Sequence, residues 1–149
     1  MGKAVILDWM GTLYDKERDL LFSHSEQVVR ELKSRGYATA VISLCHGNIE
    51  RRRNQIQRTG IQHYLDQIIV ADEKSEEQFL KCISVLGSTA EDTSIIDDRT
   101  KRGIKIGNKL GCTTYWIRSG EYAHELPDSE TGQPTRIIRS LMDILEHLR

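Results

Sequence analysis

Chemically reactive side chains follow apolar segments at several places in this 149-residue sequence. Four such positions stand out: Asp8, Ser43, the Asp72-Glu73-Lys74 cluster and the Asp97-Asp98 pair. Carboxylates act as nucleophiles or as hard oxygen ligands for Mg²⁺, and hydroxyl and ammonium groups stabilise a phosphoryl group. If the apolar segments are neighbouring parallel strands, these positions meet beyond the carboxyl edge of one sheet, where ligands bind in such folds.

The elements that must position these residues alternate between apolar and amphipathic segments. Strands are predicted at residues 4–7, 37–42, 67–70, 93–96 and 112–117. Helices are predicted around residues 28–32, 48–58, 79–86 and 104–110, with a closing helix over 137–148. This alternation predicts an α/β fold, a three-layer αβα sandwich around a Rossmann-like, mainly parallel sheet. We expect residues 1–149 to form one domain.

The composition excludes several classes of partner. Charged residues make up 29% of the chain, hydrophobic residues 38%, and the formal net charge is -1. This balance gives no basic surface of the kind that binds nucleic acid, so a nucleic-acid partner is not expected. The sequence has no membrane-spanning apolar run. Three scattered cysteines favour reduced thiols and a cytoplasmic location.

The sequence Asp8-Trp9-Met10-Gly11-Thr12, after its apolar strand, resembles the first motif of the haloacid dehalogenase superfamily. Ser43, Lys74 and Asp97-Asp98 resemble the second, third and fourth motifs in order, and the resemblance covers about residues 3–117. It implies a hydrolase of phosphatase type.

The resemblance also implies a role for each residue. Asp8 would be the nucleophile that forms an aspartyl intermediate. Gly11 would open the backbone toward the anion and Thr12 would support that turn. Ser43 would donate a hydrogen bond to the phosphoryl group, and Lys74 would offset the charge that phosphate and Asp8 bring together.

A Mg²⁺ ion would be held by Asp8, Asp98 and the carbonyl of Met10, with Asp97 as a further candidate ligand. Substrate contacts would come from Trp9, Met10, Gly11 and His46. Alternatives stay open: an acid after a strand is often only a helix cap. Asp97 stands where the family often has glycine, and the spacing after Lys74 is one residue shorter than usual.

Two departures from the family pattern are conspicuous. Met10 stands where phosphatases of the family carry a second aspartate. Haloacid dehalogenases also lack this aspartate, and phosphonoacetaldehyde hydrolases resemble the sequence at Asp8-Trp9-x-Gly-Thr, but both carry a helical cap after the first motif. An acid–base group at that position supplies roughly 10²–10⁴-fold in rate. Arg102 and Gly103 stand where a further Asp or Asn is usual, so the metal site should lose a ligand or a supporting acceptor.

The intervals between the motifs leave no room for a cap domain, which indicates a cap-less family member with an open site. We expect a phosphorylated substrate, macromolecular or small, and a homo-oligomer or a partner that covers a mouth lined by Trp9, Met10, Tyr14 and His46. The basic residues Arg51, Arg52, Arg53 and Arg58 are interpreted as a solvated helix face or as a contact to a phosphorylated partner. Two hypotheses remain: a Mg²⁺-dependent phosphohydrolase with impaired acid–base chemistry, and a binding or regulatory domain that has lost turnover.

Overall fold

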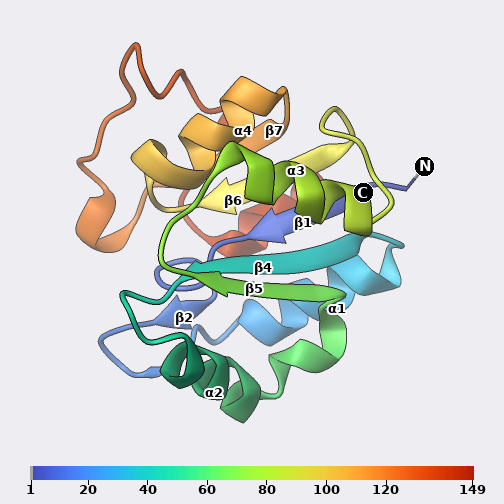
Figure 1. Ribbon diagram of the computed structural model, residues 1–149, viewed down its shortest axis with the longest axis vertical. Coiled ribbons are helices and arrows are strands. Elements are labelled where there is room, and N and C mark those ends of the chain that lie inside the picture. Colours follow the sequence, from blue (N-terminus) through green and yellow to red (C-terminus); the bar gives the residue numbers. More distant parts are fainter. Residues whose placement is uncertain (1) are drawn as a thin grey trace.

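A parallel sheet of six strands forms the centre of the molecule in the computed structural model, which describes residues 2–149 (Figure 1). The strand order is β5-β4-β1-β6-β7-β8, and every neighbouring pair is parallel. The strands are β1 (Ala4–Leu7), β4 (Ala38–Leu44), β5 (Gln67–Ala71), β6 (Thr93–Asp97), β7 (Thr113–Ile117) and β8 (Arg136–Ile138). A separate hairpin pairs β2 (Tyr14–Asp15) with β3 (Leu20–Leu21).

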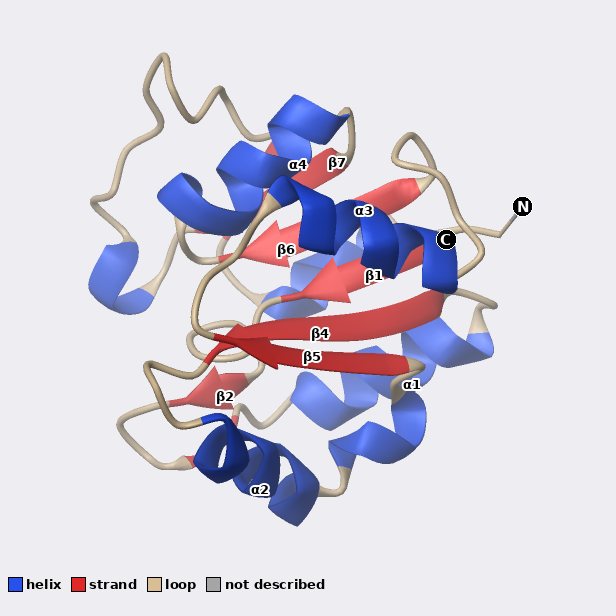
Figure 2. Ribbon diagram, in the orientation of Figure 1, coloured by secondary structure: helices blue, strands red, loops and turns tan. Residues whose placement is uncertain are grey.

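Helices cover both faces of this sheet (Figure 2). One face carries α1 (Ser25–Ser34), α2 (Ile49–Thr59) and the 3₁₀ helices η1 (Ile61–Tyr64) and η4 (Leu141–Glu146). The other face carries α3 (Glu76–Val85) and α4 (Lys105–Leu110). A π-helical turn, η2 (Thr100–Ile104), precedes α4, and a short 3₁₀ helix, η3 (Gly120–Tyr122), follows β7.

The alternation of side chains along β1 explains why the sheet needs both layers. Val5 and Leu7 are buried in the core beneath α1, α2 and η4, whereas Ile6 is buried in the core beneath α3 and α4. Successive side chains of a strand point to opposite faces, so a fully apolar strand is stable only with both faces covered. The predicted α/β class with a parallel, Rossmann-like sheet is therefore confirmed.

The predicted closing helix over residues 137–148 is wrong. Residues 136–138 instead add β8 to the sheet edge beside β7, with Ile138 buried and Ile137 54% exposed, as in a strand with one covered face. Ser140 and Asp143 then form a capping box that starts η4, so the helical turns begin only after this point. Within residues 2–149, no helix combines the length and the apolar character needed to cross a membrane.

Candidate active site

Asp8 lies at the centre of the carboxyl edge of the sheet. Its strand β1 pairs with β4 on one side and β6 on the other, and the Asp8 N–H donates to the carbonyl of Ile96 at 3.0 Å. The chain runs from β1 to β4 and β5 on one side and then returns to β6 on the other side of β1, and such a reversal of strand order places ligand sites in open α/β folds. The Asp8 side chain keeps 12% of its surface exposed, so an incoming substrate can reach it.

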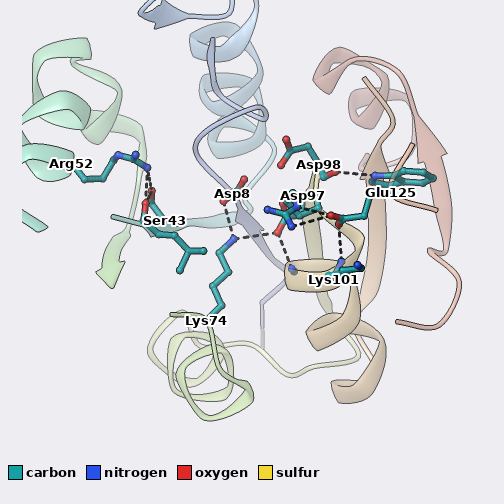
Figure 3. A network of polar contacts seen from close by, with 12 residues as sticks. Asp8, Ser43, Arg52, Lys74, Asp97, Asp98, Lys101 and Glu125 are labelled. Atoms are coloured by element: carbon teal, nitrogen blue, oxygen red, sulfur yellow. Dashed lines mark hydrogen bonds and ion pairs between the residues drawn. The ribbon is translucent and has the colours of Figure 1, made fainter. Parts of the chain in front are cut away.

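Lys74 connects Asp8 to the end of β6 (Figure 3). Its Nζ lies 2.8 Å from Oδ1 of Asp8 and 3.2 Å from Oδ2 of Asp97, and only 4% of its side chain is exposed. The next residue, Ser75, caps α3 by accepting a hydrogen bond from the N–H of Gln78, which fixes the backbone beside the lysine. The segment after Lys74 is one residue shorter than in the family pattern, but the Lys74 ammonium group still reaches Asp8.

Asp97 is held by backbone donors as well as by the lysine. Its Oδ1 accepts from the Arg99 N–H at 2.9 Å, and its Oδ2 accepts from the Gly103 N–H at 2.8 Å. A side chain at position 103 has no space, because a Cβ atom there would stand 2.9 Å from the Cβ of Asp97 and closer still to Oδ2. Gly103 is thus the residue that allows the π-helical turn η2 to approach and bind this carboxylate.

Asp98 faces the turn after β1. A Cβ atom at Gly11 would collide with the Asp98 carboxylate, and Gly11 also has a left-handed backbone with φ of 83°. Oδ1 of Asp98 is buried and has no hydrogen-bond partner among residues 2–149. One oxygen from each of Asp8, Asp97 and Asp98 lies within 4.8 Å of the others.

The electrostatics of this cluster favour a bound cation. Burial, followed by the charges of Asp8 and Asp97, raises the pKa of Asp98 to about 9. Burial and the charge of Asp97 raise the pKa of Asp8 to about 6, although Lys74 acts in the opposite direction. Burial alone would lower the pKa of Lys74, but its two carboxylate partners outweigh that effect and raise it. Burial also opposes ionisation of Asp97, yet Lys74 and the backbone donors bring its pKa below the ordinary value.

These properties fit a hard divalent cation. Lys74 pairs with two of the three carboxylates, Asp8 and Asp97, and the buried Oδ1 of Asp98 offers lone pairs that no donor within residues 2–149 uses. Asp97 already accepts three hydrogen bonds, so Asp8 and Asp98 are the carboxylates with more lone pairs free.

Ser43, on β4, lies on the opposite side of Asp8 from β6. It is contacted by Arg52, one of the basic residues interpreted from the sequence as a solvated face or as a contact to a phosphorylated partner. Arg52 of α2 donates from Nη1 to Oγ of Ser43 at 2.8 Å and to the carbonyl of Leu44 at 2.7 Å. Ser43 is buried and Arg52 is half-buried, whereas Arg51 and Arg53 are exposed. The solvated-face interpretation is therefore wrong for Arg52.

The remaining predicted site residues divide into two groups. Thr12 is buried with an unpartnered hydroxyl, Met10 is half-buried, and His46 is exposed in a left-handed turn after β4 with φ of 50°. The prediction that Trp9 and Tyr14 line an open mouth is wrong. Both residues are buried, and their rings stack with centroids 5.1 Å apart. Trp9 points into the core because it alternates with Asp8, and its Nε1 donates to Gln55.

Glu125 is a supporting residue that no sequence motif indicated. Its carboxylate accepts from the Arg99 guanidinium at 2.9 Å, and from the Thr100 hydroxyl and the Lys101 N–H at 3.1 Å each. Arg99 also stacks over the ring of Tyr122, with 3.8 Å between its Cζ and the ring centroid. The segment after β7 therefore holds the start of η2, which carries the donors to Asp97 (Figure 3).

Comparison with known proteins places this geometry in a family. A family model described as haloacid dehalogenase-like hydrolase matches residues 3–117. Among curated proteins, a glyceraldehyde 3-phosphate phosphatase from Methanocaldococcus jannaschii is 27% identical over 133 residues, which cover 86% of this chain. The chain spans only 58% of the length of that relative.

Solved structures share the fold over nearly the whole chain. An uncharacterized protein from Listeria monocytogenes serotype 4b superposes with a TM-score of 0.78 at 20% identity, covering 98% of this chain and 96% of its own. A D,D-heptose 1,7-bisphosphate phosphatase from B. bronchiseptica, solved with magnesium and phosphate, has a TM-score of 0.77 at 14% identity, covering 98% of this chain and 97% of its own.

Proposed function

The chain belongs to the haloacid dehalogenase-like hydrolase family, and from this premise we propose that it is a Mg²⁺-dependent phosphohydrolase in which Asp8 is the nucleophile. The observation that carries the proposal is the cluster at the carboxyl edge of the sheet. There, a partly exposed carboxylate is paired with a buried lysine and lies beside two further buried carboxylates. The curated phosphatase relative supports the same reaction class.

The proposed reaction has two displacements at phosphorus. A carboxylate oxygen of Asp8 attacks the phosphoryl group and the ester P–O bond breaks, which gives an aspartyl phosphate and an alkoxide or aryl oxide that takes its proton from solvent. Water then attacks the same phosphorus, the bond to Asp8 breaks, and the carboxylate is restored with release of phosphate. Lys74 stays protonated beside Asp8 and offsets negative charge as the phosphoryl group approaches.

Asp8, Asp98 and the carbonyl of Met10 are the proposed ligands of the metal ion. When bound, Mg²⁺ would supply positive charge to the phosphoryl oxygens and orient them for in-line attack. The lone pairs of Asp97 are engaged by Lys74 and two N–H donors, so its proposed part is to anchor the lysine.

Met10 sets the proposed limit on turnover. A thioether neither protonates a leaving alkoxide nor activates water, so the proposed enzyme lacks the roughly 10²–10⁴-fold that an acid at this position contributes. Good leaving groups, such as aryl oxides, suffer least from this loss. Met10 also favours a second candidate function, a family member that binds phosphorylated ligands with little or no turnover.

We propose that neither interval between the motifs forms a cap over the site. Between Asp8 and Ser43 the chain forms only the β2–β3 hairpin and α1, and between Ser43 and Lys74 it forms α2, η1 and β5. A macromolecular phosphorylated substrate, or a homo-oligomer that covers the mouth, fits such an open site. Light scattering at micromolar concentration tests the second arrangement, and a monomer under all conditions would leave only the first.

One experiment separates turnover from binding. We expect the protein to hydrolyse p-nitrophenyl phosphate slowly and only with Mg²⁺, and Asp8→Asn to abolish this activity because the amide is no nucleophile. ¹⁹F NMR with beryllofluoride and Mg²⁺ should detect a bound mimic of the aspartyl phosphate in the wild type but not in the variant. Hydrolysis that persists in Asp8→Asn would remove Asp8 from the reaction, and a bound mimic without hydrolysis would favour the binding-domain alternative.

A further inference from the structure

Arg52 is a cation beside the proposed phosphoryl site that neither the family motifs nor the comparisons assign. It reaches the site from the first turn of α2, across Ser43 from Asp8 (Figure 3). Its Nη1 uses both protons on Ser43 Oγ and the Leu44 carbonyl, at 2.8 and 2.7 Å. Within residues 2–149, its Nε and Nη2 groups donate to no protein acceptor, and no carboxylate forms an ion pair with it.

A half-buried guanidinium without a carboxylate partner is an uncommon arrangement. Buried charges are usually paired, because removing them from water is costly. The negative charge with the greatest effect on Arg52 is that of Asp8, which partly opposes the lowering of its pKa by burial. The donors of Arg52 that have no acceptor within residues 2–149 are therefore available to an anion at the proposed phosphoryl site.

A phosphoryl dianion at this site needs positive charge beyond that of Lys74 and a metal ion. Asp8, Asp97 and Asp98 are balanced by Lys74 and a divalent cation, so these groups together offer no surplus positive charge to a phosphoryl dianion. Arg52, which contacts Ser43 and Leu44 at the end of β4, brings a further positive charge to the Ser43 side of this edge. A planar guanidinium with three free N–H donors also matches the oxygens of a phosphoryl group.

The contact with Ser43 prepares the hydroxyl for the same ligand. Because Oγ accepts from Arg52, its own proton remains available, and it makes only a long contact of 3.3 Å to the Leu44 carbonyl. A hydroxyl that accepts from a cation becomes a stronger donor. Small movements of this proton would turn it toward a phosphoryl oxygen.

We propose that Arg52 binds a non-bridging oxygen of the phosphoryl group, forming with Ser43 a clamp opposite Lys74 and the metal ligands. The inference deepens the proposed function and rests on it for the identity of the reacting group. It assigns to α2 a substrate-binding residue, with phosphate monoester dianions as the class that the clamp recognises.

Equilibrium binding of inorganic phosphate tests the clamp without turnover. In isothermal titrations with Mg²⁺ present, Arg52→Ala should weaken phosphate binding by roughly tenfold to a hundredfold, the value of a hydrogen bond to a charged group. Arg52→Lys should fall between wild type and Arg52→Ala, since it keeps the charge and loses the planar fork. Arg53→Ala, on the exposed side of the same helix, is the matched control and should bind phosphate as wild type does.

A second measurement uses the wild-type protein and needs no folded variant. Phosphate should protect Arg52 from modification by phenylglyoxal while leaving Arg53 reactive, as followed by peptide mass spectrometry. Unchanged phosphate affinity in a folded Arg52→Ala variant, or equal modification of Arg52 with and without phosphate, would overturn the clamp. If hydrolysis that depends on Asp8 is not found but phosphate binding still depends on Arg52, the proposed function is overturned and the clamp stands.

Discussion

Replacing Gly103 by alanine is the sharpest test of how the acidic cluster is built. The added methyl group would stand 2.9 Å from the Cβ and 3.1 Å from the Cγ of Asp97, and closer to its Oδ2. Ordinary carbon contacts are longer, so the Asp97 carboxylate and η2 must separate by roughly 1 Å. This separation breaks the 2.8 Å hydrogen bond from the Gly103 N–H and moves the acceptor that Lys74 contacts at 3.2 Å.

Two terms set the size of the effect. A lost hydrogen bond to a buried charged group costs about 1.5–3 kcal/mol. Crowding a packed interior with one methyl group costs about 1–3 kcal/mol. Since part of the crowding is relieved by the same movement that breaks the bond, we expect Gly103→Ala to lower the free energy of unfolding by about 2–5 kcal/mol. Displacing a group that supports metal ligands also lowers metal affinity, typically by roughly 10–100-fold.

Urea unfolding and titration with Mg²⁺ measure the two effects separately. Gly107→Ala is the matched control, because its methyl group would crowd Thr114 Cγ2 at 2.6 Å and Ile95 Cδ1 at 2.9 Å, in the core rather than at the carboxylates. We expect both variants to lose stability, but only Gly103→Ala to lose Mg²⁺ affinity. Equal Mg²⁺ affinities in the two variants would refute the inference that Gly103 supports the site through Asp97.

Three further outcomes are expected. Met10→Asp should raise turnover of simple phosphomonoesters by about one to two orders of magnitude, within the range of an added acid–base group, as measured by phosphate release. Asp98→Asn should become increasingly more stable than wild type as the pH rises from about 6 to 9 without divalent cations. The folded-state pKa of Asp98 is raised from 3.8 to about 9, so between these values the folded state keeps a proton that the unfolded state has released. The wild type therefore loses stability as the pH rises through this range, and the loss levels off above about 9. A constant difference in urea midpoints would contradict this. Glu125→Gln should weaken Mg²⁺ binding, since it removes the charge that holds Arg99 and the start of η2, and an unchanged titration would show that η2 holds Asp97 unaided.

The fold could be predicted because its signals are local and repeated. Apolar strands such as Ala4–Leu7 require two covered faces, and the helices between them supply those faces. The prediction for the C-terminal segment was wrong because the spacing of Ile137, Ile138 and Leu141 fits a helix as well as a strand followed by a turn. Only the free sheet edge beside β7 and the capping box at Ser140 distinguish the two.

The supporting residues were less predictable, for different physical reasons. Arg52 carried a usable signal, because it lies four positions before the buried Ile56 and therefore shares its helix face. Glu125 carried none, since its partners Arg99 to Lys101 are more than 20 positions away and meet it only through the path of the chain after β7. Trp9 was predicted to contact the substrate because it follows Asp8 in the motif. Successive side chains of an extended segment point in opposite directions, so Trp9 points away from the site that Asp8 faces.

At the fourth motif, the unusual residues Asp97 and Gly103 are best understood as one exchange. The family pattern places glycine where this chain has Asp97, and an acid or amide about where it has Gly103. In this structure the carboxylate comes from position 97, and position 103 supplies the N–H that binds it at 2.8 Å. Lys74 keeps an acidic anchor at 3.2 Å, so the number of carboxylates near Asp8 is preserved. We therefore expect Asp97 to compensate for the acceptor that is missing at position 103, and the comparison of Gly103→Ala with Gly107→Ala tests this expectation.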